Sequence, residues 1–254
     1  MVNIKDYLDN EGILAIDWDN LRKLILEEDR EKIEEVERVV ERFPDFYDFK
    51  KHQEFYNVNC SVKINGVPFI IPATGIFRDE IEQTTPIILE HIKNDNLVLD
   101  VGCGFGHKTK FYGLNIEGKV IGLDINKSSL DIANKQKIDN MYYIRGNVFK
   151  LPFRDNLFDS VLFCNAIQED GEFSISYLNE GSYYDYKYEK IQELSRIIKP
   201  NGKLIIGHNG YDYYSEEVIK SMKESGIKIL KDYNLNHKRG GDEIENHITV
   251  GVKE

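Results

Sequence analysis

The chain has 254 residues, 41% of them hydrophobic, which is enough to bury a sizeable core in one large domain with an appendage. Its formal net charge of −11 repels a phosphate backbone and argues against binding to long nucleic acid. The longest apolar runs fall far short of the roughly 20 residues that a membrane-spanning helix needs, so we expect no membrane span.

The N-terminus and the cysteines indicate a reducing compartment. Residues 1–12, MVNIKDYLDNEG, lack both the basic start and the apolar stretch of a secretory signal, so the expected location is the cytoplasm. Cys60, Cys103 and Cys164 are widely spaced, and we expect reduced thiols. Neither they nor the six histidines have the spacing of a metal site, so no bound metal is expected.

The N-terminal part is predicted to be a helical extension. Between Asp19 and Phe43, apolar residues recur at three- and four-residue steps among Glu, Lys and Arg. This period indicates one amphipathic helix or a pair of them. Residues 60–72 are typical of a short hairpin with Asn65-Gly66 as its turn.

Apolar strands alternate with helix-length connections in the rest of the chain. A helix over about 79–93 should come first, with Ile81, Ile87, Ile88 and Ile92 facing a sheet. The expected strands are residues 96–101, 118–125, 141–146, 158–165 and 202–208, and two more strands within 226–236 and 246–252. This alternation predicts an α/β fold with a doubly wound, mostly parallel sheet covered on both faces.

The most informative segment is DVGCGFG at residues 100–106, where a strand enters a glycine-rich turn. Gly102, Gly104 and Gly106 permit positive φ and let backbone amides approach a ligand closely. Ligands of open α/β sheets bind at the carboxyl ends of the strands, so we expect a cofactor site here. Taken alone, Gly102 and Gly104 could also be ordinary tight-turn glycines.

Two observations bear on which cofactor binds. The dinucleotide pattern GxGxxG would need glycine at position 107, where the chain has His107. Asp124 ends the second strand, 24 residues after Asp100, and a carboxylate there can accept two hydrogen bonds from ribose hydroxyls. The spacing fits a cofactor held by its adenosine half better than a pyrophosphate binder. Asp124 alone could instead be a helix cap.

In this order the segments resemble class I S-adenosylmethionine-dependent methyltransferases, specifically the small-molecule group, over about residues 75–210. Residues 100–106 match the family's Asp/Glu-x-Gly-x-Gly-x-Gly pattern at every fixed position, and GNVFKLPF at 146–153 is similar to its third motif. The Lys-Pro-Asn-Gly turn at 199–202 resembles its fifth. The resemblance implies a seven-stranded Rossmann-like methyltransferase domain over 76–254, after a helical extension and candidate lid over 1–75.

The resemblance also implies S-adenosylmethionine as the cofactor. The glycine turn would cradle the methionine part, and Asp100 would face its amino group. Asn147 stands where the family commonly has an acid; it could contact adenine beside the Val148 nitrogen, or be a turn residue. The predicted cofactor-binding residues are Asp100, Gly102, Cys103, Gly104, Asp124, Ile125, Asn147, Val148 and Asn165.

The implied reaction moves a methyl group to an O or N nucleophile, with a small metabolite as the expected partner rather than nucleic acid or a membrane. Positioning and water exclusion can supply much of the acceleration, so no obligatory catalytic triad is expected. If the acceptor must lose a proton, His208 after the fifth strand is the first candidate base, with Glu169 and Tyr211 in reserve. A structural role for His208 stays open.

Four questions stay open from the sequence. The chain could be a catalytically silent cofactor-binding module, or a nicotinamide-dependent oxidoreductase, which His107 disfavours. The extension could close over the cleft, with Phe77 and Arg78 as contacts, or form a structural cap. The tyrosine-rich segment between Gln168 and Ile191 could cover the acceptor or form a surface helix.

Overall fold

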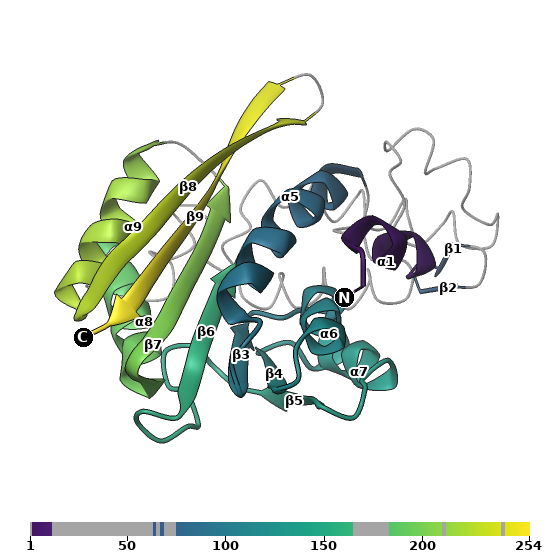
Figure 1. Cartoon of the computed structure of the whole chain (residues 1–254), viewed down its shortest axis with the longest axis horizontal. Helices are drawn as coiled ribbons and strands as arrows, with labels where there is room; N and C mark the ends of the chain where they lie inside the picture. Colours follow the sequence, from purple (N-terminus) through teal and green to yellow (C-terminus); the bar gives the residue numbers. More distant parts are fainter. Residues whose placement is uncertain are drawn as a thin grey trace.

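The computed structural model describes residues 2–11, 63–64, 67–68, 75–164, 183–209, 212–239 and 242–254. These residues include a seven-stranded sheet with the order β5-β4-β3-β6-β7-β9-β8 (Figure 1). Its strands are β3 (Leu97–Val101), β4 (Lys119–Asp124), β5 (Met141–Arg145), β6 (Phe158–Cys164), β7 (Ile198–Asn209), β8 (Ile227–Arg239) and β9 (Asp242–Lys253). The first five are parallel, and β9 runs antiparallel to both of its neighbours.

Helices cover both faces of this sheet (Figure 1). One face carries α5 (Gly75–Ile92), α6 (His107–Asn115) and α7 (Lys127–Lys135), and the other carries α8 (Tyr183–Ile197) and α9 (Asp212–Glu224). A short helix, α1 (Ile4–Asn10), packs beside α5 and α6. The predicted doubly wound α/β fold is therefore confirmed.

Alternate residues of the central strands enter two separate cores. Val98 and Leu162 pack with α1, α5 and α6, whereas Leu99 and Val161 pack beneath α8 and α9. All four side chains are at most 1% exposed. Burial on both faces explains the continuous apolar runs in these strands. Asp100, one residue after Leu99, faces the same side as α6.

The predicted flanking elements agree with the structure where it describes them. The helix predicted over 79–93 is α5, and its Ile81, Ile88 and Ile92 are buried. The predicted hairpin is formed by β1 (Lys63–Ile64) and β2 (Val67–Pro68). The amphipathic helix predicted between 19 and 43 lies outside the described residues. Four tyrosines of the 168–191 segment, Tyr183, Tyr184, Tyr186 and Tyr188, lie in the first half of α8.

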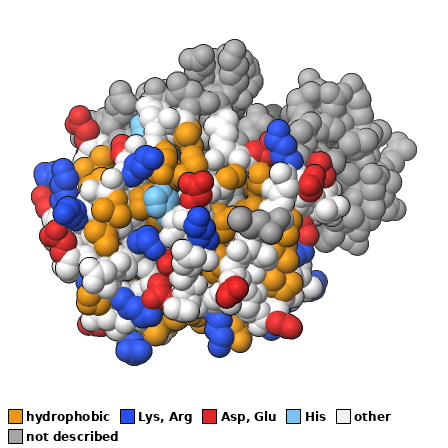
Figure 2. Space-filling model, in the orientation of Figure 1, with side chains coloured by type: hydrophobic (Ala, Val, Ile, Leu, Met, Phe, Trp, Pro, Cys, Tyr) orange, Lys and Arg blue, Asp and Glu red, His pale blue; other side chains and the backbone are white. Residues whose placement is uncertain are grey.

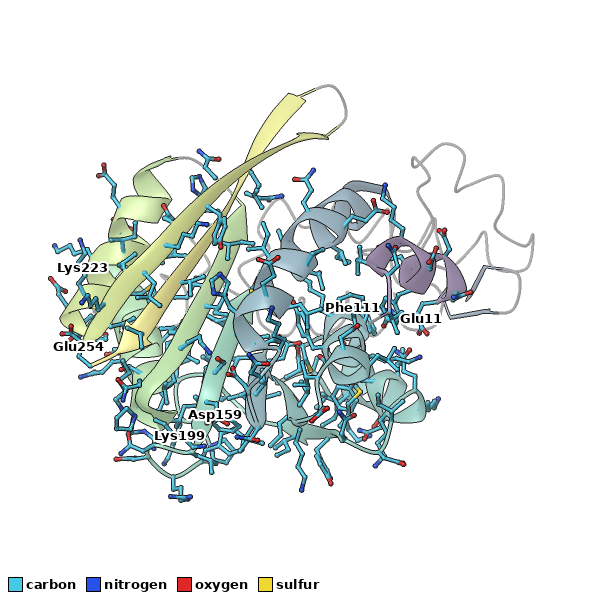
Figure 3. All side chains as sticks on the ribbon, in the orientation of Figure 1. Glu11, Phe111, Asp159, Lys199, Lys223 and Glu254 are labelled. Carbon is cyan, nitrogen blue, oxygen red and sulfur yellow. The ribbon has the colours of Figure 1, made fainter. Side chains whose placement is uncertain are left out.

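The edge of the sheet where the parallel strands begin, the amino edge, differs from the edge where they end, the carboxyl edge. At the amino edge, the Asp159 carboxylate accepts hydrogen bonds from the Leu97 nitrogen at 2.9 Å and from Lys199 Nζ at 2.6 Å (Figure 3). At the carboxyl edge, β8 and β9 continue past the last β7 pair and form an arm that projects beyond the sheet (Figure 1). The amino edge is thus closed by ionic contacts, whereas the carboxyl edge is flanked by loops and the arm.

Charges of both signs are interspersed on the described face in Figure 2, where they form no single-sign patch. None of the helices in the described ranges is sufficiently long and apolar to cross a membrane.

Candidate cofactor site

The glycine turn after β3 folds back over the end of β4. Gly102, Gly104 and Gly106 have φ of 74°, 53° and 80°, as predicted for a turn that needs glycine. The amides of Gly102 and Cys103 both donate to the Leu123 carbonyl, at 2.7 and 3.1 Å. These two hydrogen bonds hold the start of the glycine turn, after β3, against the end of β4.

Asp124 ties this turn to the second strand. Its Oδ2 accepts a hydrogen bond from the Gly104 nitrogen and its Oδ1 accepts one from the Asn126 nitrogen, both at 2.8 Å. Burial raises the pKa of Asp124, and these backbone donors oppose the rise. An ionised carboxylate offers about four lone-pair sites, so both oxygens can accept further donors such as two ribose hydroxyls. The N-cap of α7 is Asn126 rather than Asp124.

Asp100 is buried behind the turn, with 6% of its surface exposed. Burial raises its pKa to about 6, the hydroxyl of Thr109 opposes the rise by donating to Oδ2 at 2.6 Å, and the nearby Asp124 charge adds to it. Two carboxylates thus lie close together at the start of the site. No sequence pattern indicated Thr109, because the contact depends on how α6 packs on β3.

The turn leaves space for a ligand at one glycine and not at another. A Cβ added to Gly104 would meet no atom within 4 Å, whereas a Cβ added to Gly106 would lie 2.2 Å from the Tyr143 hydroxyl. Gly104 therefore borders open space that a ligand can enter, and Gly106 is required by the protein's own packing. Exposed backbone beside a diol-binding carboxylate fits an adenosine-containing cofactor.

The third predicted motif forms a turn at the same edge. Asn147 Oδ1 accepts a hydrogen bond from the Phe149 nitrogen at 3.0 Å, which is the turn role considered above, and Val148 packs against the core. The amide oxygen can accept a second donor, so an adenine contact stays a prediction. The Ile125 carbonyl accepts from Arg145 Nε at 3.0 Å and links the ends of β4 and β5.

The register places the candidate base at this edge. Val101 pairs with Phe163, and Phe163 pairs with Ile206, so the backbone of His208 lies two residues beyond the row that contains Val101. Asn165, Glu169 and Tyr211 lie outside the described residues. The first turn of α5 contains Phe77 and Arg78. The catalytic and lid roles of these residues stay predictions.

His107, the residue that breaks the dinucleotide pattern, begins α6 directly after the turn. Both nitrogens of its ring are buried and have no hydrogen-bond partner among the described residues. Burial lowers its pKa to about 4, so the ring is neutral at neutral pH. Cys103 in the turn is half-buried, and the loss of solvent around its thiol raises the pKa of that group and keeps it protonated.

Comparison with known proteins agrees with this geometry. Residues 99–206, which contain the glycine turn and Asp124, match the methyltransferase domain family. The uncharacterized protein MJ0638 of Methanocaldococcus jannaschii is 32% identical over 199 residues, which are 76% of this chain and 68% of that protein. The chain belongs to the class I S-adenosylmethionine-dependent methyltransferases.

One more relative agrees with the methyltransferase assignment, and one solved structure agrees with the fold. The ubiquinone/menaquinone biosynthesis C-methyltransferase UbiE of Wigglesworthia glossinidia brevipalpis is 32% identical over 119 residues, 44% of this chain and 42% of UbiE. A SAM-dependent methyltransferase of Methanosarcina mazei has the same fold, with a TM-score of 0.55 at 17% identity over 66% of this chain and 97% of that one. The enzyme uses S-adenosylmethionine, and the nicotinamide alternative is set aside.

Proposed function

We propose that this methyltransferase transfers a methyl group from S-adenosylmethionine to an O or N nucleophile of a small metabolite. The observation that carries the proposal is the bond from the Gly104 nitrogen to Asp124, which joins accessible backbone to a carboxylate that can accept hydroxyl donors. A small acceptor is supported by the net charge of −11 and by the mixed charges of the described face in Figure 2.

Each residue of the site has a positioning role in this proposal. S-adenosylmethionine supplies a methyl group activated by a sulfonium. Asp124 would hold the ribose hydroxyls, the backbone of the glycine turn would hold the methionine part, and Asp100 would face its amino group. Fixing the donor in this way lets alignment and water exclusion contribute up to roughly 7–11 kcal/mol to the acceleration.

A proton acceptor is needed if the nucleophile is a hydroxyl or an ammonium. His208 is the first candidate because its backbone lies at the cofactor edge of β7. A histidine with an ordinary pKa is mostly neutral above about pH 6.5 and can take that proton. Glu169 and Tyr211 are the reserves. Substitution of His208 with Gln should then remove the acidic limb of the pH profile of methyl transfer.

A carbon acceptor is the second candidate function, because the Wigglesworthia relative is named a C-methyltransferase. A ring carbon becomes nucleophilic when an adjacent hydroxyl loses its proton, so the same base would serve. The two candidates differ only in the atom that receives the methyl group.

The proposal is tested by isotope transfer. The enzyme is incubated with S-adenosylmethionine carrying a deuterated methyl group and a whole-cell extract, and the small-molecule, protein and RNA fractions of the mixture are compared by mass spectrometry. We expect label in a small-molecule product and less of that label with Asp124→Ala at a limiting cofactor concentration, and fragmentation of the product distinguishes O, N and C transfer. Label confined to protein or RNA would contradict the proposed acceptor class. Cofactor binding without any labelled product would favour the silent module.

A further inference from the structure

Residues 2–11, which contain α1, contact α6, the helix that begins where the glycine turn ends. The Val2 nitrogen donates to Asn115 Oδ1 at 2.6 Å at the far end of α6. At the near end, Lys110 Nζ lies 2.6 Å from the Glu11 carboxylate (Figure 3). Both members of this ion pair are less than 20% exposed, so the pair is shielded from solvent better than an ordinary surface pair.

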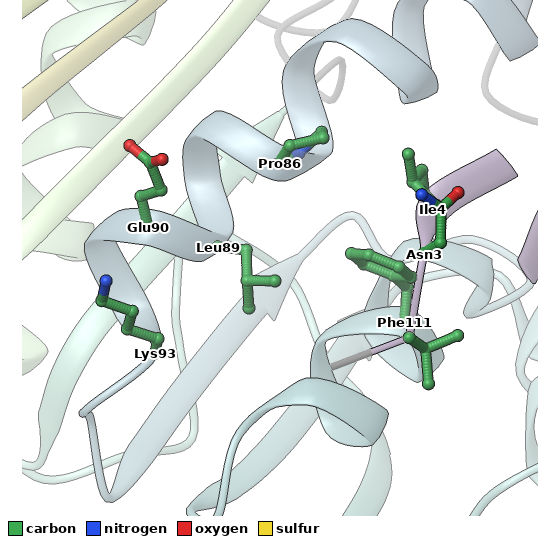
Figure 4. A pocket seen from close by; sticks show the side chains of 8 residues that line it. Asn3, Ile4, Pro86, Leu89, Glu90, Lys93 and Phe111 are labelled. Carbon is green, nitrogen blue, oxygen red and sulfur yellow. The ribbon is translucent and has the colours of Figure 1, made fainter.

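The Tyr7 side chain of α1 packs against α6. This side chain is 3% exposed, its ring centroid lies 5.3 Å from that of Phe111, and burial raises its pKa well above the ordinary value. The hydroxyl therefore stays protonated and acts as a donor. At the start of α1, Asn3 and Ile4 line a pocket of about 300 Å³ together with residues of α5 and with Phe111 (Figure 4).

Two tyrosine hydroxyls donate to consecutive carbonyls at the start of α6. The Tyr7 hydroxyl bonds the His107 carbonyl at 2.7 Å, and the Tyr143 hydroxyl from β5 bonds the Gly106 carbonyl at 3.3 Å. The Gly106 amide in turn donates to the Cys103 carbonyl at 2.9 Å, which closes the glycine turn. The end of the turn is thus bonded to the sheet through Tyr143 and to α1 through Tyr7.

We propose that Tyr7 is a positioning residue of the cofactor site, acting through the His107 carbonyl on the glycine turn. The inference rests on the cofactor site argued above. It makes α1 part of the binding machinery rather than a separate cap, and it couples the docking of α1 to cofactor binding. Coupling of this kind is reciprocal, so the bound cofactor must also stabilise the docked α1.

The direct test compares Tyr7→Phe with Tyr142→Phe. Tyr142 precedes Tyr143 on β5, is 45% exposed, and undergoes the same loss of a hydroxyl away from the turn. S-adenosylhomocysteine is titrated calorimetrically into each folded protein. Because one hydrogen bond is lost, we expect about three- to tenfold weaker binding by Tyr7→Phe and unchanged binding by Tyr142→Phe. Binding by folded Tyr7→Phe within twofold of wild type would overturn the proposal.

Amide hydrogen exchange separates positioning from general stabilisation. In wild type, S-adenosylhomocysteine should slow exchange in residues 2–11 as well as in 102–109, and Tyr7→Phe should speed exchange in 102–109 relative to the rest of the sheet. A lower unfolding midpoint with wild-type affinity and no effect of the ligand on residues 2–11 would show a purely structural helix. If Tyr7→Phe does not fold, Glu11→Gln is tested by the same two measurements. A wild type that binds no S-adenosylhomocysteine would contradict the cofactor site itself, not only the role of Tyr7.

Discussion

The two carboxylates of the site have different surroundings. Asp100 has very little contact with solvent, whereas Asp124 accepts hydrogen bonds from backbone amides. Asp100 is 6% exposed, and burial raises its pKa. Among the described residues, the Thr109 hydroxyl and the Lys108 charge oppose this rise, and the Asp124 charge adds to it. Burying a charge with few partners costs folding free energy, and such costs are commonly found where binding requires them. Asp100 should therefore reduce stability in the protein without cofactor.

Substitution of Asp100 with Asn is expected to stabilise the cofactor-free protein at pH 7.5. The folded pKa of about 6 lies above the ordinary 3.8, so the ionised form opposes folding above about pH 6, and this penalty disappears as the pH falls toward 3.8. The gain should be about 1–3 kcal/mol at pH 7.5 and should shrink toward zero near pH 4. Urea unfolding curves at several pH values measure it.

The control for this measurement is Asp131→Asn. Asp131 is exposed and pairs with Lys127 one helical turn away, so its loss should change stability by less than about 0.5 kcal/mol at every pH. His107 titrates in both Asp100→Asn and Asp131→Asn. Subtracting one curve of unfolding free energy against pH from the other therefore removes the contribution of His107. A less stable Asp100→Asn at pH 7.5 would mean that the buried carboxylate is fully compensated by its surroundings.

At the scale of elements, the glycine turn depends on the strand beneath it. The Tyr143 ring occupies the space that a Cβ at Gly106 or at Gly122 would need, with atoms 2.2 and 2.6 Å from those positions. Gly104 has no such neighbour within 4 Å. The glycines of the motif thus serve different purposes, one for ligand access and one for packing between the turn and β5.

Gly106→Ala and Gly226→Ala form a matched pair that tests this difference. Both glycines have similar positive φ, 80° and 76°, but a Cβ at Gly226 meets nothing within 4 Å. Left-handed backbone should cost each variant about 1–2 kcal/mol, and overpacking against Tyr143 should add about 1–3 kcal/mol for Gly106→Ala. Denaturant unfolding measures the two costs. We expect the difference in stability cost between the two variants to become smaller when Tyr143 is replaced with Leu. If that difference does not change, the Tyr143 ring is not its cause.

At the scale of the whole molecule, the order of the sheet brings distant motifs to one edge. Parallel pairing of β3 with β4 and β6, and of β6 with β7, places the ends of four strands together. The sequence predicted these strands because each is a local apolar run. It also predicted the glycine turn and the residues at the carboxyl ends of the strands, because Asp and Gly follow those runs directly. The doubly wound parallel part of the fold followed from those patterns, and the seven-stranded sheet followed from the family resemblance.

The supporting contacts could not be predicted from the sequence. Thr109, Tyr143 and Tyr7 reach the site through side chains of α6, β5 and α1, and Tyr7 contacts a carbonyl 100 positions away. Residues this far apart share no sequence period. The turn formed by Asn147 is equally a matter of side-chain geometry, since an amide at that position can bond its own backbone or a ligand.

The central claim is that Asp124 and the glycine turn together hold S-adenosylmethionine, and calorimetric titration of wild type and Asp124→Ala with S-adenosylhomocysteine tests it most directly. Asp124→Ala removes a charged acceptor whose bonds to ribose are each worth about 1.5–3 kcal/mol, and it also removes the anchor of the Gly104 nitrogen. We expect one site per chain in wild type and at least about tenfold weaker binding in the folded variant. Equal affinity in the two folded proteins would contradict it.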